Sequence, residues 1–278
     1  MHPELFRIGN FVITSFGLML GLSFLAAGWV GSLEFERKGF HRDVSWSLVL
    51  GALIGGIVGA KLYYAFLNFP ELARDPLGTI LSRAGLVWYG GLIGGAIGAT
   101  YMVRRERLPF GQAADVAAVS LPVAYAIGRI GCFLVGDDYG KPTNSWIGLA
   151  FPQGQPPTTA GNLRRFFGVH VPASVPDSTV LHVYPTQLFE VGLSALIFLA
   201  LWRMRRHPHR AGWLFAVYLV LAGLERGFIE FFRAKDDRFF GPFTLAQLIS
   251  VVLIVAGLLG MLTLWRRTQE APASSTTS

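Results

Sequence analysis

The sequence has few charged residues for its length and only one cysteine. Asp, Glu, Lys and Arg make up 15% of its 278 residues, whereas soluble domains carry about 25%. A single cysteine excludes an internal disulfide, a CxxC redox pair and a metal site built from several thiolates. The sequence also lacks a P-loop, a Gly-x-Ser-x-Gly elbow and a His-Glu-x-x-His zinc motif. These absences argue against the common nucleotide-binding, serine hydrolase and zinc protease classes.

The chain is instead rich in apolar residues and glycine. Hydrophobic residues make up 52% of the sequence, its mean hydropathy is +0.47, and most of its 33 glycines stand inside apolar runs. Glycine inside apolar runs is typical of membrane helices that pack closely. The net charge of +7 comes largely from basic residues in short segments between these runs, where lipid headgroups and topology signals account for them. The composition therefore predicts an integral membrane protein whose partners include membrane lipids and no nucleic acid.

Seven apolar stretches approach the length of about 20 residues that a helix needs to cross the hydrocarbon core. The first is longer than the core of a signal peptide and lacks a basic leader and a small-residue cleavage site, so we expect it to remain as a helix. The sequence thus predicts an all-α integral membrane fold with seven transmembrane helices. Their expected ranges are 10–30, 45–67, 85–103, 112–136, 183–202, 212–232 and 243–265.

The basic residues are denser in alternate connections between the predicted spans. Residues 31–44, 104–111 and 203–211 are short and rich in arginine, whereas the other connections spread their basic residues over a greater length. Cytoplasmic loops carry the excess of Lys and Arg in membrane proteins. We therefore expect the N-terminus outside, and the C-terminus with its tail of residues 266–278 in the cytoplasm.

One long segment interrupts the predicted membrane domain of residues 1–265. Residues 137–182 contain several prolines and scattered glycines and show no sustained helical period. Such a composition predicts turns and irregular structure. We expect this segment to form a small irregular or short-stranded cap on the outer, periplasmic face.

Two glycine-rich runs stand on the second and third predicted spans. They are Gly-Ala-Leu-Ile-Gly-Gly at residues 51–56 and Gly-Gly-Leu-Ile-Gly-Gly at residues 90–95. Small residues at this spacing let the backbones of two membrane helices approach closely. The runs therefore predict close packing between these two helices.

An arginine stands near the end of the fourth predicted span. Arg129 lies in the run Gly-Arg-Ile-Gly-Cys-Phe of residues 128–133. A guanidinium in a membrane helix costs about 3 kcal/mol or more, and it usually faces a partner, a cavity or a substrate. The glycines on either side remove side-chain bulk, so another group can approach the backbone. Arg129 is therefore the first candidate for a functional residue.

The polar residues of the predicted spans gather in their outer halves instead of dividing between the leaflets, with Asp115 at an inner end as the exception. Ionisable residues inside a membrane usually face a shared interior or a water-filled cavity. We therefore expect one polar cavity that opens toward the outer leaflet. Its expected residues are Lys61, Trp88, Tyr89, Arg129, Gln187, Glu190, Arg226 and Glu230, with Arg233 at its mouth.

The spacing on the sixth predicted span leaves two interpretations open. Arg226, Glu230 and Arg233 follow each other at i, i+4 and i+7, so they share one helix face. They can form ion pairs that hold helices together without a part in catalysis. Alternatively, the cations in the outer halves of the spans outnumber the acids there, which points to an anionic ligand, and arginine matches a phosphate bidentately.

Each of three residues that follow Arg129 in the sequence has two interpretations. Cys132 is either a small packing residue, as buried free cysteines usually are, or a nucleophile. Asp137 and Asp138 are either solvated loop acids or groups that orient the site.

Several short motifs follow one another along nearly the whole chain. The longest is Gly-Arg-Ile-Gly-Cys-Phe-Leu-Val-Gly-Asp-Asp-Tyr-Gly-Lys-Pro-Thr at residues 128–143. The others are His-Pro-Glu-Leu-Phe at 2–6, Tyr-Gly-Gly-Leu-Ile-Gly at 89–94, Tyr-Pro-Thr-Gln-Leu-Phe-Glu at 184–190, Arg226 with Glu-Phe-Phe-Arg at 230–233, and Leu-Ala-Gln-Leu-Ile-Ser at 245–250. In this order they resemble the signature of the prolipoprotein diacylglyceryl transferases.

The resemblance implies a seven-helix enzyme of the bacterial inner membrane with an outward-facing cap. Such an enzyme moves the diacylglyceryl group of phosphatidylglycerol to the lipobox cysteine thiol of a prolipoprotein signal peptide, the first step of lipoprotein maturation. A thioether forms and glycerol phosphate leaves. The family's phosphate-contacting arginine corresponds to Arg129, its second essential arginine to Arg226, and a further functional acid to Glu230.

The cavity and the resemblance together define a set of expected site residues. Because the arginines supply the positive charge, we expect no metal and no cofactor. The expected catalytic residues are Arg226, Tyr89, Glu230 and Asp137. The expected substrate-binding residues are Arg129, Arg226, Gly131, Cys132, Gly140, Gln187, Glu190 and Phe16.

At several of these positions the chain differs from what is common in the family. Phe16 stands where tyrosine is usual, Tyr89 where histidine is frequent, Cys132 where asparagine is usual, and Asp137 where glutamate is usual. A phenol has a pKa near 10 and is a poor base at neutral pH. The base is therefore Tyr89, Glu230 or Asp137, with Tyr89 otherwise orienting the phosphate. The same changes leave one alternative function, a phospholipid-binding or lipid-transporting paralogue without catalysis.

Overall fold

The computed structural model describes residues 4–8, 11–81, 87–234, 238–240 and 243–265. The His-Pro start of the first motif and the predicted cytoplasmic tail lie outside the described residues. The chain divides into two compact units, a smaller one of Phe24–Val116 and a larger one that combines Met1–Ser23 with Ala117–Ser278. Each unit is mostly helical, and the described strands form three two-stranded antiparallel ribbons.

Five of the described helices are long and apolar enough to cross a membrane, as expected of a multi-pass membrane protein. The helices α5 (Trp88–Arg105) and α9 (Trp213–Glu230), of 18 residues each, coincide with two further predicted spans but fall outside this class. The prediction of seven spans is therefore not established. The five are α1 (Ser15–Arg37), α2 (Asp43–Leu67), α6 (Phe110–Val135), α8 (Thr186–Met204) and α10 (Leu245–Thr263).

In the smaller unit, α2 and α5 pack through facing glycines. A Cβ atom built on Gly94 would lie 2.2 Å from the carbonyl oxygen of Gly55, and one on Gly98 would lie 2.0 Å from that of Gly51. Gly59 and Gly90 face each other in the same way. Any larger side chain at these positions would collide with the backbone of the other helix. The predicted close packing of the two glycine-rich runs is confirmed.

The remainder of the smaller unit carries a small core and the short helices α3 (Phe69–Arg74) and α4 (Pro76–Leu81). Phe35, Val103 and Val116 are buried together where α1 ends, α5 ends and α6 begins. Buried Asp115 lies 3.8 Å from the ammonium of Lys38, so its charge has a cationic partner at this end.

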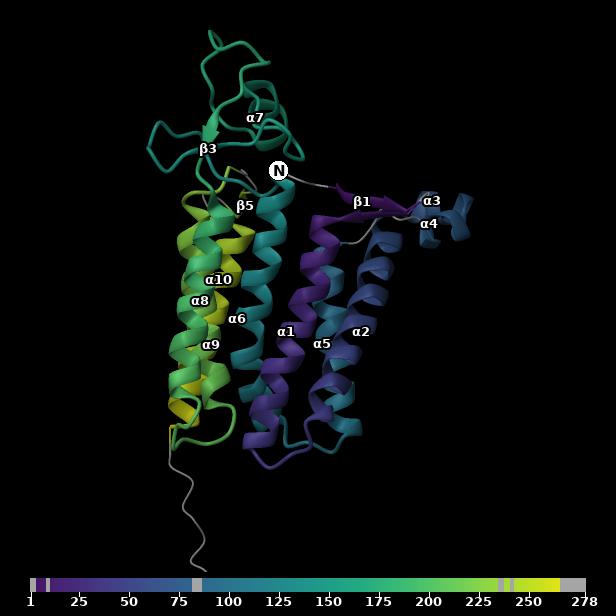
Figure 1. The fold of residues 1–278 in the computed structure, drawn as a ribbon, viewed down its shortest axis with the longest axis vertical. Helices are drawn as coiled ribbons and strands as arrows, with labels where there is room; N and C mark the ends of the chain where they lie inside the picture. Colours follow the sequence, from purple (N-terminus) through teal and green to yellow (C-terminus); the bar gives the residue numbers. More distant parts are fainter. Residues whose placement is uncertain (1–3, 9–10, 82–86, 235–237, 241–242, 266–278) are drawn as a thin grey trace, which may run out of the picture. The chain divides into compact units, whose positions relative to one another are not determined.

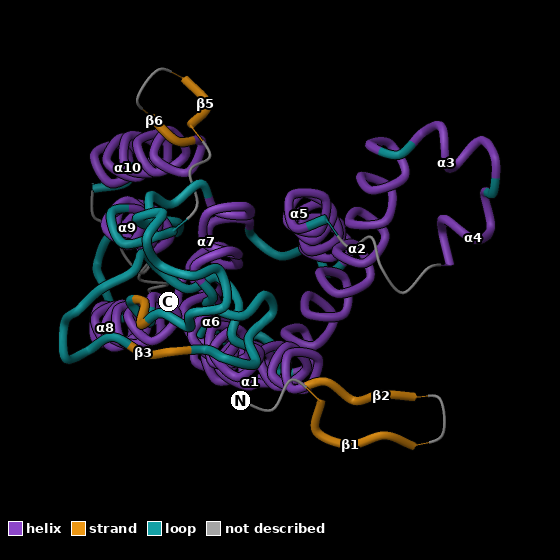
Figure 2. The backbone as a smooth tube through the Cα atoms, turned by 90° about the horizontal axis from the view of Figure 1, so that it is seen from above, coloured by secondary structure: helices purple, strands orange, loops and turns teal. Residues whose placement is uncertain are grey.

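In the larger unit, α9 lies between α8 and α10 (Figure 2). A Cβ on Gly257 of α10 would lie 2.6 Å from the carbonyl oxygen of Ala216, which explains why α9 and α10 pack closely. A hairpin of β1 (Glu4–Ile8) and β2 (Phe11–Thr14) precedes α1. The ribbon of β5 (Arg238–Phe240) and β6 (Phe243–Thr244) precedes α10, whose first turn is held by the capping box of Thr244 and Gln247.

The long segment between α6 and α8 lies beyond the ends of these two helices (Figure 1). It packs around a hydrophobic core to which Phe133 of α6 and Ala234 also contribute. It contains the short strands β3 (Leu149–Ala150) and β4 (His182–Val183) and the helix α7 (Ala160–Phe167). Tyr139, Phe151 and Leu163 are almost completely buried in its core. The sequence correctly predicted short strands and irregular backbone here, but α7 was not expected. Its ends are fixed by the Thr159 N-cap and by Gly168 with φ +63°.

The glycine contacts yield a prediction about stability. Gly94→Ala places a methyl group against the Gly55 carbonyl, so we expect a loss of about 1–3 kcal/mol through overpacking. Gly192→Ala on α8 is the control, because among the described residues no atom beyond the backbone of α8 lies within 4 Å of its added Cβ, and alanine favours a helix. Thermal unfolding in detergent measures both. A melting temperature of Gly94→Ala equal to that of Gly192→Ala would contradict the packing.

Candidate active site

The site is built around Arg129, which lies near the end of α6 in the larger unit. Its side chain is 13% exposed. Tyr125 lies one helical turn earlier, and the Arg129 guanidinium carbon sits 5.0 Å from the centre of the Tyr125 ring. The aromatic ring thus supports the cation from the same helix face.

Three polar groups surround the guanidinium of Arg129. Nη1 donates to Oδ2 of Asp138 at 2.9 Å, and Nη2 donates to the Tyr125 hydroxyl at 3.0 Å. Nη2 also lies 3.0 Å from Oε1 of Glu190 on α8, and the Tyr125 hydroxyl donates to that same oxygen at 2.7 Å. Glu190 is almost completely buried, so its charge depends on these two partners.

Asp138 joins Arg129 to a second arginine. Its other carboxylate oxygen, Oδ1, accepts a hydrogen bond of 3.0 Å from Arg233, just beyond α9. The chain reaches this position through a tight turn, in which Gly136 has φ +74° and Asp138 has φ +54°. Burial acts against ionisation, but the charges of Arg233 and Arg129 prevail and lower the pKa of Asp138. Of the two interpretations of Asp138, the orienting one matches this geometry.

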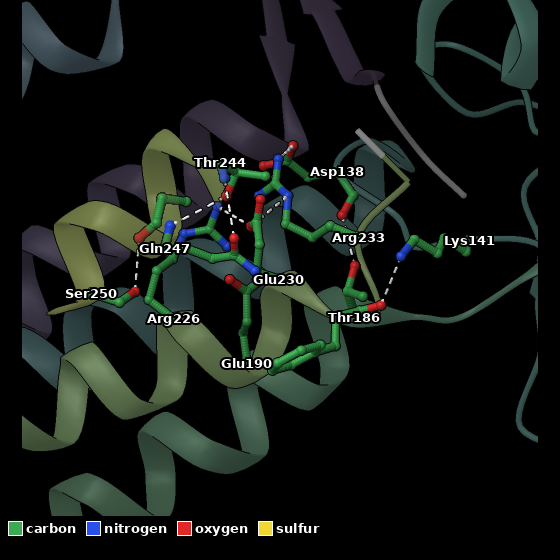
Figure 3. Close-up of polar contacts among 12 residues, drawn as sticks. Asp138, Lys141, Thr186, Glu190, Arg226, Glu230, Arg233, Thr244, Gln247 and Ser250 are labelled. Atoms are coloured by element: carbon green, nitrogen blue, oxygen red, sulfur yellow. Dashed lines mark hydrogen bonds and ion pairs between the residues drawn. The ribbon is translucent and has the colours of Figure 1, made fainter. Parts of the chain in front are cut away.

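On α9, the spacing read from the sequence forms real ion pairs. Arg226 Nη2 lies 2.7 Å from Oε2 of Glu230, and Nε of Arg233 lies 4.0 Å from the same oxygen. Figure 3 shows this series continuing from Arg226 through Glu230 and Arg233 to Asp138. The arginines of α6 and α9 therefore belong to one network.

Gly140 and Gln187 hold the turn after α6 against the start of α8. The Gly140 N–H donates to the Tyr184 carbonyl at 2.8 Å, and a Cβ on Gly140 would lie 2.5 Å from the Phe232 carbonyl oxygen. The buried Gln187 side chain donates to the backbone carbonyl of Asp137. Both residues, expected to bind substrate, here position the turn that carries the two aspartates.

Asp137 has a different environment from Asp138. Among the described residues, its buried Oδ1 atom has no hydrogen-bond partner. Burial, followed by the nearby charge of Asp138, raises the pKa of Asp137 to about 6. This environment favours a role in the site over that of a solvated loop acid, and the pKa suits a group that exchanges a proton near neutral pH.

Phe16 and Gly131 lie at a close approach between the first turn of α1 and α6. A Cβ on Gly131 would lie 3.0 Å from Cβ of Met19 and 3.4 Å from the Phe16 ring. Cys132 is buried, and Arg129 Nη1 lies 3.7 Å from its sulfur. These contacts fit the interpretation of Cys132 as a packing residue beside the arginine.

Two guanidinium N–H groups in the network remain unpaired within the described part of the chain. They belong to Nε of Arg129 and Nη1 of Arg226, and both are buried. A buried donor without an acceptor costs about 1–3 kcal/mol. Each arginine thus has a carboxylate partner and a further donor that an anionic ligand can use.

The structure does not bring every expected residue into this network. Tyr89 and Lys61 belong to the smaller unit. Tyr89 is exposed and lies edge-on to Trp88. That Tyr89 and Lys61 line the predicted cavity stays a prediction. So does the excess of cations over acids in the outer halves of the spans, because Lys61 was counted in it. Within the larger unit, Arg129, Arg226 and Arg233 are matched by the three carboxylates of Asp138, Glu190 and Glu230.

Sequence reasoning missed several polar residues of the larger unit. Tyr125 precedes Arg129 by four residues, so helical spacing was a signal that could have revealed it. Thr186, whose hydroxyl donates to the Asp138 carbonyl at 2.8 Å, stands in the motif of residues 184–190, and that motif was a signal that could have revealed it. Glu225 accepts a hydrogen bond of 2.6 Å from Ser194 on α8. Glu225 is adjacent to Arg226 in sequence, but its side chain contacts Ser194 on α8, which the sequence did not indicate.

Comparison with known proteins adds independent information. The family described as prolipoprotein diacylglyceryl transferase matches residues 3–263. Three similar proteins bear the name phosphatidylglycerol–prolipoprotein diacylglyceryl transferase. They come from Clostridium tetani (29% identity, covering 93% of this chain and 96% of the relative), Geobacter sulfurreducens (30%, 93% and 93%) and Symbiobacterium thermophilum (30%, 99% and 97%).

The matched region includes every arginine and carboxylate of the network described above. The order of the sequence motifs and the family match therefore agree over nearly the whole chain. The chain belongs to the prolipoprotein diacylglyceryl transferase family.

Proposed function

We propose that this chain transfers the diacylglyceryl group of phosphatidylglycerol to the lipobox cysteine thiol of prolipoproteins, the first step of lipoprotein maturation. The observation that carries the proposal is the pair of buried guanidinium N–H groups on Arg129 and Arg226 that have no acceptor among the described residues. The names of the similar proteins favour this transferase over a non-catalytic lipid-binding paralogue.

Arg129 and Arg226 bind the phosphate of the lipid. Each is already fixed by a carboxylate, Arg129 by Asp138 at 2.9 Å and Arg226 by Glu230 at 2.7 Å. Held in this way, the two cations need little reorganisation when the ligand arrives. The carboxylates also keep the network close to neutral without ligand, which limits the cost of holding charges in a membrane protein.

The thiol sulfur attacks the glyceryl carbon that is bonded to the phosphate oxygen. The C–S bond forms as the C–O bond breaks, and glycerol phosphate departs with the electron pair of that bond. Negative charge grows on the leaving phosphate during this step. The two arginines therefore stabilise the transition state more than the bound lipid, which is the condition for catalysis.

A base must accept the thiol proton, and Asp137 is the best of the three candidates. Glu230 already forms ion pairs with Arg226 at 2.7 Å and Arg233 at 4.0 Å, so its carboxylate holds the arginines in place. Tyr89 is a phenol in the other unit and suits an orienting part better. Asp137 combines a buried, unpartnered Oδ1 atom with a pKa raised to about 6.

The remaining proposals concern the membrane. The chain crosses the bacterial inner membrane seven times, with its N-terminus outside and its C-terminus in the cytoplasm. Residues 137–182 form the periplasmic cap, and phosphatidylglycerol enters from the outer leaflet. Gly131, Cys132, Phe16, Gly140, Gln187 and Glu190 line or support the lipid site. The basic residues of alternate loops support this orientation. The network at the end of α6, where the cap segment begins, supports a lipid site on the outer side.

The first prediction concerns the phosphate contacts. Arg129→Ala and Arg226→Ala should each lower the rate about a hundredfold, because each removes a charge contact worth about 3 kcal/mol in the transition state. Thioether formation between phosphatidylglycerol and a lipobox peptide, followed by mass spectrometry, measures the rate. Arg165→Ala on the exposed face of α7 is the matched control and should keep full activity. Undiminished product from Arg129→Ala would contradict the proposal.

The second prediction concerns pH. A base works only when ionised, so the rate of the wild-type enzyme should rise with pH up to about 6 and then level off. Asp137→Asn should remove this rise and most of the activity, whereas Asp177→Asn in the cap should change neither. The rate of the same thioether assay, measured across pH for the wild type and both variants, tests this prediction. A wild-type rate that climbs only through about pH 8.5, the ordinary pKa of a free thiol, would instead mean that the thiol ionises without Asp137.

The third prediction concerns Tyr125. Tyr125→Phe removes one hydroxyl that both receives a hydrogen bond from Arg129 and donates one to Glu190. We expect a fall of about tenfold in kcat/KM, corresponding to about 1.5 kcal/mol. Tyr101→Phe, at an exposed position on α5, is the control. Equal kcat/KM for both variants would show that the hydroxyl does not fix Arg129.

A further inference from the structure

The C-terminal end of α8 lies away from α7 (Figure 1). A groove at this end is lined largely by arginines. Its volume is about 500 Å³, and it is lined by Leu199, Trp202, Arg203, Arg205 and Arg206. Arg203 comes 13 residues after Glu190 on the same helix, a distance of about 20 Å along the axis. The groove is therefore separate from the Arg129 network.

The turn that bears these arginines is held in place. The guanidinium carbon of Arg205 lies 3.5 Å from the centre of the Trp202 ring. Further along the turn, the Arg210 N–H donates to the Leu264 carbonyl at 3.2 Å, and the His209 ring stacks on Trp265 at 4.4 Å. The groove is thus formed without a ligand, which reduces the entropy lost on binding.

The charge of this region has one sign. Residues 199–212 contain four arginines and no acidic residue. Arg203 stands in the last turn of α8, where a cation complements the helix dipole, but Arg206 lies beyond the helix. Helix capping therefore does not account for the whole cluster, and its charge is complementary to an anion.

The apolar side of the groove continues along α8. Leu199 lines the groove, and Leu196 and Leu199, three residues apart, are 64% and 59% exposed. Residues three apart are neighbours on one helix face. A free phosphate would gain nothing from this surface, whereas an acyl chain can cover it.

We propose that this groove binds the headgroup of an anionic phospholipid from the membrane surface at this end of α8. The arginines contact its phosphate, and its acyl chain lies along Leu199 and Leu196. This site is distinct from the one proposed for catalysis, and its occupation requires no turnover.

Photo-crosslinking tests the proposal. The wild-type protein is placed in phosphatidylcholine nanodiscs with a small share of phosphatidic acid that carries a diazirine beside the glycerol ester. We expect label in the segment 196–206, located by mass spectrometry. Arg203→Gln with Arg206→Gln should lower labelling of that segment about thirtyfold, because each exposed arginine contributes about a factor of five to anionic lipid binding.

The matched control is Arg104→Gln with Arg105→Gln, which removes two exposed arginines from the last turn of α5. It should leave labelling of segment 196–206 unchanged. If both double variants lost labelling of segment 196–206 equally, general surface charge would explain the binding, and the proposal would be overturned. Equal labelling by a diazirine phosphatidylcholine, or displacement by millimolar inorganic phosphate, would overturn it as well. None of these outcomes bears on thioether formation, so the proposed function is tested separately.

Discussion

The larger unit depends on one constraint: a guanidinium near the end of an apolar helix needs ionic and hydrogen-bonding partners. Arg129 finds them on three segments, in Tyr125 on its own helix, Glu190 on α8 and Asp138 in the following turn. Asp138 then takes Arg233 as a second partner. Because the network crosses from α6 to α8 and to the end of α9, it fixes how these three helices meet. Removing one member leaves another charge buried without a partner, so the members are interdependent.

The same network separates two aspartates that are adjacent in sequence. Asp138 lies between two arginines, which lower its pKa, while Asp137 is partly buried without an arginine partner among the described residues and has a raised pKa. Environment alone assigns one carboxylate to structure and leaves the other available for proton transfer. The tight turn after Gly136 produces this difference, because it directs the two side chains to different surroundings.

The sequence predicted the features that depend on helix geometry within one segment or on the cost of a charge in a membrane. An arginine in an apolar helix, the i, i+4 spacing of Arg226 and Glu230, and the facing glycines all follow from helix geometry and the cost of buried charge. The position of Asp138 did not follow, because it depends on a left-handed turn that no spacing rule gives. The hydrogen bond between Ser194 and Glu225 depends on how α9 is rotated against α8, which periodicity along one helix does not reveal. The helix α7 was missed because proline and glycine dominate its surroundings.

The facing glycines of α2 and α5 have a consequence for motion. Tyr89 adjoins Gly90, whose backbone lies against that of Gly59, so α5 cannot slide along α2 without a collision of main-chain atoms. The two helices must therefore move as one body. Rotation of the Tyr89 side chain remains a fast local event, but any displacement of its backbone belongs to the slower class of collective helix motions, on the microsecond-to-millisecond scale.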